Sequence, residues 1–174
     1  MQSFTEHFSG ISDPRIERTK KHKLIDILFL TMAAVICGCD EWREIELYAD
    51  NKQSWLRKYI ELPNGIPSHD TINRFISAID PAAMQACFIQ WVASIAAVSE
   101  EEVVSIEGKR LCNSGQDSKE AIVHIVSAWS SANHLVLGSY KVEDKHNEIT
   151  AIPKLLELLD LSGCIITIDA IGWQ

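Results

Sequence analysis

The stretch CIITIDAIGWQ (residues 164–174) decides the fold prediction, because an apolar segment in it leads directly into an acid. The residues Cys-Ile-Ile-Thr-Ile form a short, largely β-branched run that is typical of a strand covered on both faces. Asp169 follows this run at once. A carboxylate at the end of such a strand is either solvated there or part of a site, and its neighbours in the sheet decide which.

The residues before this stretch predict three more strands and a helix. The strand segments are VVSIEGK (103–109), AIVHIVSAWS (121–130) and HLVLGSYKVED (134–144). A Gly-Lys turn signal ends the first segment, and residues 130–133 predict a hairpin turn. PKLLELLD (153–160) predicts a helix whose first turn contains Pro153, where the missing N–H costs little. The order β-β-β-α-β opens a ribonuclease-H-like fold, and two other α+β folds share it.

The first hundred residues predict helices. HKLIDILFLTMAAVICG (22–38) is apolar nearly all round, so we expect a central helix that Gly38 terminates. An amphipathic segment with a break near Asp50 and Asn51 follows it. We therefore predict an α+β protein with a helical domain over residues 1–98 and an incomplete ribonuclease-H-like domain over 99–174.

Two further helices are expected around a short break. Ser68 is a good N-cap for the segment HDTINRFISAI (69–79), and Asp80-Pro81 starts the next helix. Such a pair can be a helix-turn-helix, although most small helical domains contain similar pairs. The polar residues expected on the outer face are His69, Asp70, Asn73 and Arg74. The alternative is that these residues form a solvated face.

Charge gives a mixed indication about partners. The net charge is −8, divided as −3 over residues 1–100 and −5 over residues 101–174, which argues against a polyanionic partner. The basic cluster RIERTKKHK contains Arg15, Arg18, Lys20, Lys21 and Lys23 against one acid. It is either a solvated arm or helix start, or a set of phosphate contacts that would release several counterions.

Nothing in the sequence directs the chain to a membrane or out of the cell. The most apolar run, residues 27–39, has 13 residues, whereas a bilayer requires about 20. No signal-peptide pattern opens the sequence. The five cysteines are odd in number and stand mostly among apolar residues, which favours a reducing compartment. We expect a cytoplasmic protein.

Two carboxylates are candidates for a metal site. Glu107 follows VVSI and Asp169 follows CIITI, on strands that are neighbours in the suspected fold. A pair of Mg²⁺ ions about 3.5–4 Å apart can drive phosphodiester chemistry, and such ions take oxygen ligands. Each acid could also be solvated at a strand terminus. Lys109 and Arg110 could contact a phosphate near this site or be exposed loop cations. His124 is expected to be a hydrogen-bonded core or interface residue rather than a ligand.

Five stretches together resemble one family. They are HKLIDILFLTMAAVICG (22–38), NGIPSHDTINRF (64–75), IEGKRL (106–111), HIVSAW (124–129) and NEITAIPKLLELLDLSGCIITIDAIGWQ (147–174). This set resembles the H-repeat-associated transposases, a bacterial insertion-sequence group of the DDE type. The resemblance implies an associated helical domain, a ribonuclease-H-like catalytic domain, DNA as partner, and two Mg²⁺ ions held by an Asp-Asp-Glu triad.

The family's first acid matches Glu107 and its second matches Asp169, whereas the third, a later Glu, has no counterpart in these residues. The family has Asp where Glu107 stands, and the extra methylene moves the carboxylate by about 1.5 Å, although Mg²⁺ requires near-ideal octahedral geometry. The family also tends to have Arg in place of Cys112, and Met and Cys at 171 and 173.

These departures lead to competing expectations. The first is a C-terminally truncated, catalytically inactive transposase. The second is a DNA-binding or partner-binding module that modulates an intact transposase or forms a homo-oligomer. A metabolic or structural α+β domain is the third. We also expect self-association, because the last strand would be incompletely covered.

Overall fold

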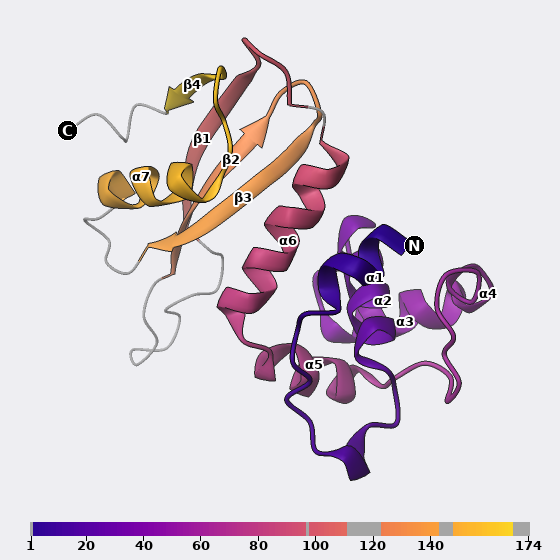
Figure 1. Ribbon diagram of the computed structural model, residues 1–174. Helices are drawn as coiled ribbons and strands as arrows, with labels where there is room; N and C mark the ends of the chain where they lie inside the picture. The colour runs from indigo at the N-terminus through magenta and orange to yellow at the C-terminus, as the bar shows by residue number, and fades with distance from the viewer. Residues whose placement is uncertain (1, 97, 111–122, 143–147, 169–174) are drawn as a thin grey trace. The chain divides into compact units, whose positions relative to one another are not determined.

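The computed structural model describes residues 2–96, 98–110, 123–142 and 148–168 (Figure 1). The chain forms two compact units, Met1–Cys87 and Phe88–Gln174. Helices build the first unit, and a four-stranded mixed sheet with a helix builds the second. The predicted class, α+β with the helices first, is therefore confirmed.

The helices are α1 (Gln2–Phe8), α2 (Leu24–Ile36), α3 (Trp42–Asn51), α4 (Gln53–Leu56), α5 (His69–Ala78), α6 (Pro81–Ile95) and α7 (Glu148–Leu158), with a 3₁₀ turn at Glu17–Thr19. The strands are β1 (Val103–Arg110), β2 (His124–Ser130), β3 (Leu135–Val142) and β4 (Ile165–Ile168). In the described ranges, no helix combines the length and apolarity that crossing a bilayer requires.

Helix α2 is the central element of the first unit. Its residues Ile27, Leu28 and Leu30 are fully buried, as the apolar pattern predicts. The helix ends where Gly38 was expected to stop it: Gly38 has φ +90°. The amide of Gly38 donates to the Val35 carbonyl and that of Cys39 to the Ala34 carbonyl, which is the Schellman arrangement of helix ends.

The later helices follow the predicted breaks. The expected interruption near Asp50 falls at Lys52, between α3 and α4. Ser68 stands at the N-cap position of α5, as predicted, but its hydroxyl lies 3.1 Å from the Thr71 hydroxyl and makes no cap hydrogen bond to the backbone. Helix α6 begins at Pro81, directly after Asp80.

The sheet has the strand order β3-β2-β1-β4. Strands β1, β2 and β3 pair antiparallel, and β4 joins the other side of β1 in parallel, with Ile106 opposite Ile168. Helix α7 lies between β3 and β4 in the chain, and because these two strands stand on opposite edges of the sheet, the connection crosses over β2 and β1. The predicted order β-β-β-α-β is therefore present in the described residues.

Two predicted element boundaries are wrong. Strand β1 does not end at a Gly-Lys turn, because Gly108 pairs with Val126 and the ladder continues to Arg110 opposite His124. Helix α7 begins at Glu148 rather than at Pro153, so the proline lies inside the helix. In both cases long-range packing outweighs the local signal.

One face of the sheet carries the core of the second unit. Val104 and Ile106 of β1 pack with Val126 of β2, and residues of α6 and α7 such as Val92 and Leu155 belong to the same cluster. Gly138 on β3 makes this packing possible: a Cβ there would lie 3.0 Å from Leu159 Cδ2 and 3.3 Å from Ile89 Cγ1. Helix α6 and the residue that directly follows α7 therefore approach the β3 backbone closely.

Candidate functional site

Glu107 lies within β1 rather than at its end, which corrects the predicted strand-end position. It is the fifth residue of an eight-residue strand and pairs with Ser127 of β2. Side chains alternate along a strand, so Glu107 shares the face opposite to the buried Val104 and Ile106. Glu107 and Lys109 are exposed on that face, and Ser105 is half-buried. The carboxylate is therefore open to solvent.

The second predicted acid, Asp169, lies outside the described residues. The described part of the parallel ladder between β1 and β4 ends with Ile106 opposite Ile168. In the sequence, the acid Glu107 follows Ile106 and the acid Asp169 follows Ile168. No group of three or more His, Cys, Asp or Glu side chains that could hold a metal ion occurs in the described parts of the chain.

The structure describes some of the other residues predicted near Glu107 and leaves others out. Lys109 is exposed in β1, two residues after Glu107, so the two side chains share one face of the strand. For Arg110 only the backbone is described, and Cys112 lies outside the described residues. His124 is half-buried at the start of β2, opposite Arg110 and Val142.

Three of the five cations in the basic cluster form ion pairs within the first unit. Arg15 Nη2 lies 2.7 Å from Asp13 Oδ2, Lys20 pairs with Glu17, and Lys23 pairs with Glu61. Arg18 and Lys21 are exposed. The cluster is therefore not a uniformly solvated arm.

A hollow of about 430 Å³ lies beside this cluster in the first unit. We call it the basic hollow, and the residues that line it are Arg15, Lys21, His22, Thr71, Arg74 and Phe75. The basic cluster supplies the first three of them and α5 the last three. The hollow therefore brings together the basic cluster and helix α5, which the sequence analysis treated separately.

The groups around the basic hollow influence one another's charge. Hydrogen bonds from Arg15 hold the pKa of the Asp13 carboxyl below its usual value. Burial, together with the charges of Arg15 and Lys21, lowers the pKa of His22, so the imidazole is neutral at neutral pH. The positive charges of the hollow therefore belong to Arg15, Lys21 and Arg74.

Sequence reasoning named Arg15, Lys21 and Arg74 but did not bring them together, and it missed His22 as a site residue. On α5, the residues expected on an outer face behave largely as predicted: Asp70 and Arg74 are exposed. His69 departs from this, because its Nδ1 lies 2.6 Å from Glu46 Oε2 on α3. The separation of 52 residues between His22 and Arg74 gives no local signal of their proximity.

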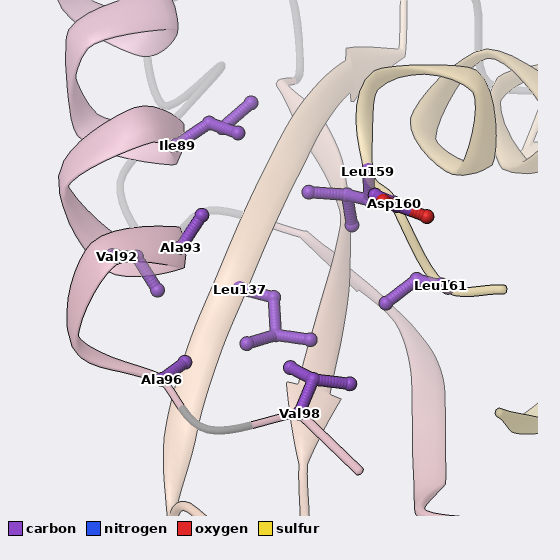
Figure 2. A pocket seen from close by; sticks show the side chains of 9 residues that line it. All are labelled: Ile89, Val92, Ala93, Ala96, Val98, Leu137, Leu159, Asp160 and Leu161. Atoms are coloured by element: carbon purple, nitrogen blue, oxygen red, sulfur yellow. The ribbon is translucent and has the colours of Figure 1, made fainter. Parts of the chain in front are cut away.

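The second unit contains a smaller hollow of about 70 Å³ near the end of α6 (Figure 2). Its lining residues are Ile89, Val92, Ala93, Ala96, Val98, Leu137, Leu159, Asp160 and Leu161. Figure 2 shows the aliphatic side chains of α6, β3 and the segment after α7 gathered around it. With one carboxylate among nine residues, this hollow is a packing gap in the core and offers little chemistry.

Comparisons with known proteins agree in pointing to one family. The family model described as "DDE_Tnp_1-associated" matches residues 5–92. "Putative transposase YncI" of Escherichia coli O157:H7 is 47% identical over all of this chain, which covers 45% of that protein. The protein of the same name in E. coli K12 is 46% identical, with 71% of it covered.

"H repeat-associated putative transposase YhhI" of E. coli K12 is 43% identical over the whole chain, which covers 46% of that protein. The chain thus spans about half the length of two of these three relatives. No solved structure matches it.

Proposed function

Since this chain belongs to the H repeat-associated transposase family, we propose that its second unit is part of a ribonuclease-H-like domain that cuts and rejoins DNA. The observation that carries the proposal is the parallel pairing of β4 with β1, which sets Ile106 opposite Ile168. One residue further along each strand, the sequence has an acid, Glu107 or Asp169.

The strand arrangement supports the ribonuclease-H-like assignment. An antiparallel meander of three strands, a crossover helix and a fourth strand parallel to the first is the expected opening of that fold. The described sheet has this order and these directions. Helices α6 and α7 contribute to the core on one face, and the opposite face carries the exposed Glu107.

Glu107 and Asp169 are the proposed ligands of Mg²⁺. Neighbouring strands lie about 4.8 Å apart, so two carboxylates on adjacent parallel strands can reach the same pair of ions. When bound, two such ions activate the attacking oxygen and stabilise the leaving oxygen of a phosphodiester. The chain's own contribution is to hold the ligand oxygens in position, which β1 does through its ladders to β2 and β4.

We expect a polypeptide of these 174 residues to be catalytically inactive. It supplies two of the three acids, and Glu107 is longer than the family's Asp. A ligand displaced by about 1 Å can cost on the order of 100-fold in rate. Incubation with Mg²⁺ and DNA carrying insertion-element ends should therefore produce no nicks, and efficient cleavage by the purified chain would contradict the proposal.

The metal assignment can be tested without activity. Mn²⁺ should broaden the amide NMR signals of Ile106 and Ile168 in the wild-type chain, and Glu107→Gln or Asp169→Asn should abolish the effect. Glu107→Asp should strengthen it. Glu157→Gln, which changes an exposed acid on α7, is the matched control. Broadening that persists in both ligand variants would refute the shared site.

A second candidate function is a DNA-binding or partner-binding module that modulates an intact transposase. The observation that favours it is the basic hollow, which gathers three cationic residues in a chain with net charge −8. Binding should weaken steeply with salt, because phosphate contacts release counterions. A gel shift at low and moderate salt, with the chain alone and mixed with an intact relative, tests this function. Absence of any complex at low salt would discard it.

A further inference from the structure

Two polar atoms of residues that line the basic hollow have no hydrogen-bond partner among the described residues. They are Arg15 Nη1 and His22 Nδ1, and both are shielded from solvent. His22 as a whole is 8% exposed. Buried polar groups are nearly always hydrogen-bonded, so an unsatisfied group calls for a reason such as a bound ligand. Here two such groups belong to one hollow, and the residues that carry them, Arg15 and His22, are in contact with each other.

The rest of the Arg15 guanidinium is firmly held. Its Nε and Nη2 atoms donate to Asp13 at 2.9 and 2.7 Å, and Nη2 also donates to the His22 carbonyl at 2.9 Å. The guanidinium carbon lies 4.7 Å from the ring centroid of Phe75, within the range of a cation–π contact. Arginine presents its donors in a rigid fork, so these contacts fix the direction of the remaining nitrogen.

The charge of the hollow favours an anion. Asp13 neutralises one of its three cations, and Lys21 and Arg74 are exposed and contribute two further positive charges. Arg74 Nε donates to the Asp70 carbonyl at 3.2 Å, which orients the side chain along α5 and leaves its terminal amino groups available. Thr71 also lines the hollow, and its hydroxyl lies 3.1 Å from that of Ser68.

We propose that the basic hollow is a site for a phosphate group of a nucleic acid backbone, with Arg15, Lys21 and Arg74 as its charged ligands and His22 as a further hydrogen-bonding residue of its lining. The inference deepens the second candidate function and does not depend on the metal carboxylates. A volume of about 430 Å³ exceeds that of one phosphate, so it leaves room for the flanking sugars. The exposed Arg18 extends the positive surface along the same basic cluster.

The experiment measures binding of the full 174-residue chain to a 20-base-pair DNA duplex by fluorescence anisotropy at several salt concentrations. Lys21→Gln and Arg74→Gln are the test variants, because both side chains are exposed and their loss should not unfold the helical unit. Lys58→Gln and Arg43→Gln are the matched controls, since they remove exposed cations of the same unit outside the hollow.

Each test variant should bind DNA on the order of tenfold more weakly at low salt, and each should reduce the slope of log K against log salt by about 0.9. A parallel series with inorganic phosphate at constant ionic strength should raise the unfolding temperature of the wild type and of both controls more than that of the test variants. Both series are run with EDTA and without divalent ions, so the proposed metal site takes no part in either and the two proposals are tested separately.

Two results would overturn the proposal. If the controls weaken DNA binding as much as the test variants do, the effect reflects net charge and the hollow is no site. If inorganic phosphate stabilises the wild type selectively but the test variants bind DNA normally, the ligand is a free anion, and the assignment to a nucleic acid backbone is wrong.

Discussion

Glu102 is a buried carboxylate that links the start of the sheet to the turn between β2 and β3. It accepts hydrogen bonds from the Ser130 hydroxyl, from the Ser99 amide at 3.2 Å and from Asn133 Nδ2 at 3.3 Å. The Ser130 hydrogen bond is the main reason why the pKa of Glu102 lies below its ordinary value near 4.5. The ionised form is thus the one that the folded state favours.

This carboxylate should make stability depend on pH. A depressed pKa contributes stability above the unfolded value near 4.5, and the contribution is lost as the pH falls through the folded pKa. We expect Glu102→Gln to lower the unfolding temperature at pH 7, with the difference from the wild type shrinking below pH 4.5. Circular dichroism melts from pH 7 to pH 3 measure this. Glu100→Gln, at an exposed position, is the control, and a difference that stays constant with pH would contradict the expectation.

At the residue scale, the sequence could supply candidates but not their surroundings. Glu107 was identified from its place after an apolar run, and it does lie on a strand next to β4. The proximity of Arg15, His22 and Arg74 depends on how the α5 helix packs, which no local pattern encodes. The sequence shows which residues could bind a metal or a phosphate, because this depends on residue type. It does not show which of them lie together, because this depends on long-range packing.

Helix α7 contains a proline where regular hydrogen bonding would need a donor. Pro153 is the sixth residue of the helix and is exposed. A proline in a helix interior removes one backbone hydrogen bond, and its ring crowds the carbonyl of the residue four positions before it. The buried Ala151 and Ile152 explain why the helix nevertheless begins before it, since their packing into the core of the second unit outweighs the local cost.

Pro153→Ala should therefore stabilise the second unit. The expected gain is about 1–3 kcal/mol, reduced by the greater conformational freedom that alanine gives the unfolded chain. Urea unfolding of the wild type and the variant measures it. Glu157→Ala, at another exposed position of the same helix, is the control. A loss of stability in Pro153→Ala would mean that the ring makes contacts worth more than the missing hydrogen bond.

Strand β4 is an edge of the described sheet, and its side chains are poorly covered. Ile165 is 53% exposed and Ile168 is 39% exposed. An exposed apolar edge strand is a template for pairing with another chain. We expect Ile165→Lys to shift sedimentation toward the monomer, with Val136→Lys on the other edge strand as the control. A wild-type chain that sediments as a monomer at high concentration would exclude self-association through this edge.

At the element scale, strand and helix types were predictable because they follow local periodicity. The order β-β-β-α-β and the stop at Gly38 are both visible in the sequence. The boundaries of β1 and α7 were not predictable in this way. Gly108 reads locally as a turn residue but is held by its pairing with Val126, and that pairing forms across a separation of 18 residues.

At the scale of the whole chain, α6 spans the division between the two compact units, which falls between Cys87 and Phe88. The later part of the helix belongs to the core of the second unit, where Val92 is 3% exposed and Phe88 and Trp91 pack against the same cluster. The predicted domain boundary at residues 98 and 99 remains a prediction, and it would separate these side chains from the sheet.

Two fragments should therefore differ in stability. Residues 81–174 should unfold cooperatively in urea, whereas residues 99–174 should not, because burial of a valine side chain such as Val92 alone contributes about 1.5–3 kcal/mol. Urea titrations followed by tryptophan fluorescence and by circular dichroism compare them. A fragment of residues 88–174 is the intermediate control. Equal cooperativity in all three would show that α6 is dispensable for the sheet.

The close approach at Gly138 makes the residue types tolerated at positions 89, 138 and 159 depend on one another, although these positions are far apart in the sequence. A methyl group there would meet Leu159 Cδ2 at 3.0 Å and Ile89 Cγ1 at 3.3 Å. A homologue with alanine at this position is therefore expected to have a smaller residue at 89 or 159, as a compensatory change. Substitutions at the three sites should be epistatic, so that Gly138→Ala is damaging by itself and tolerated together with Leu159→Ala.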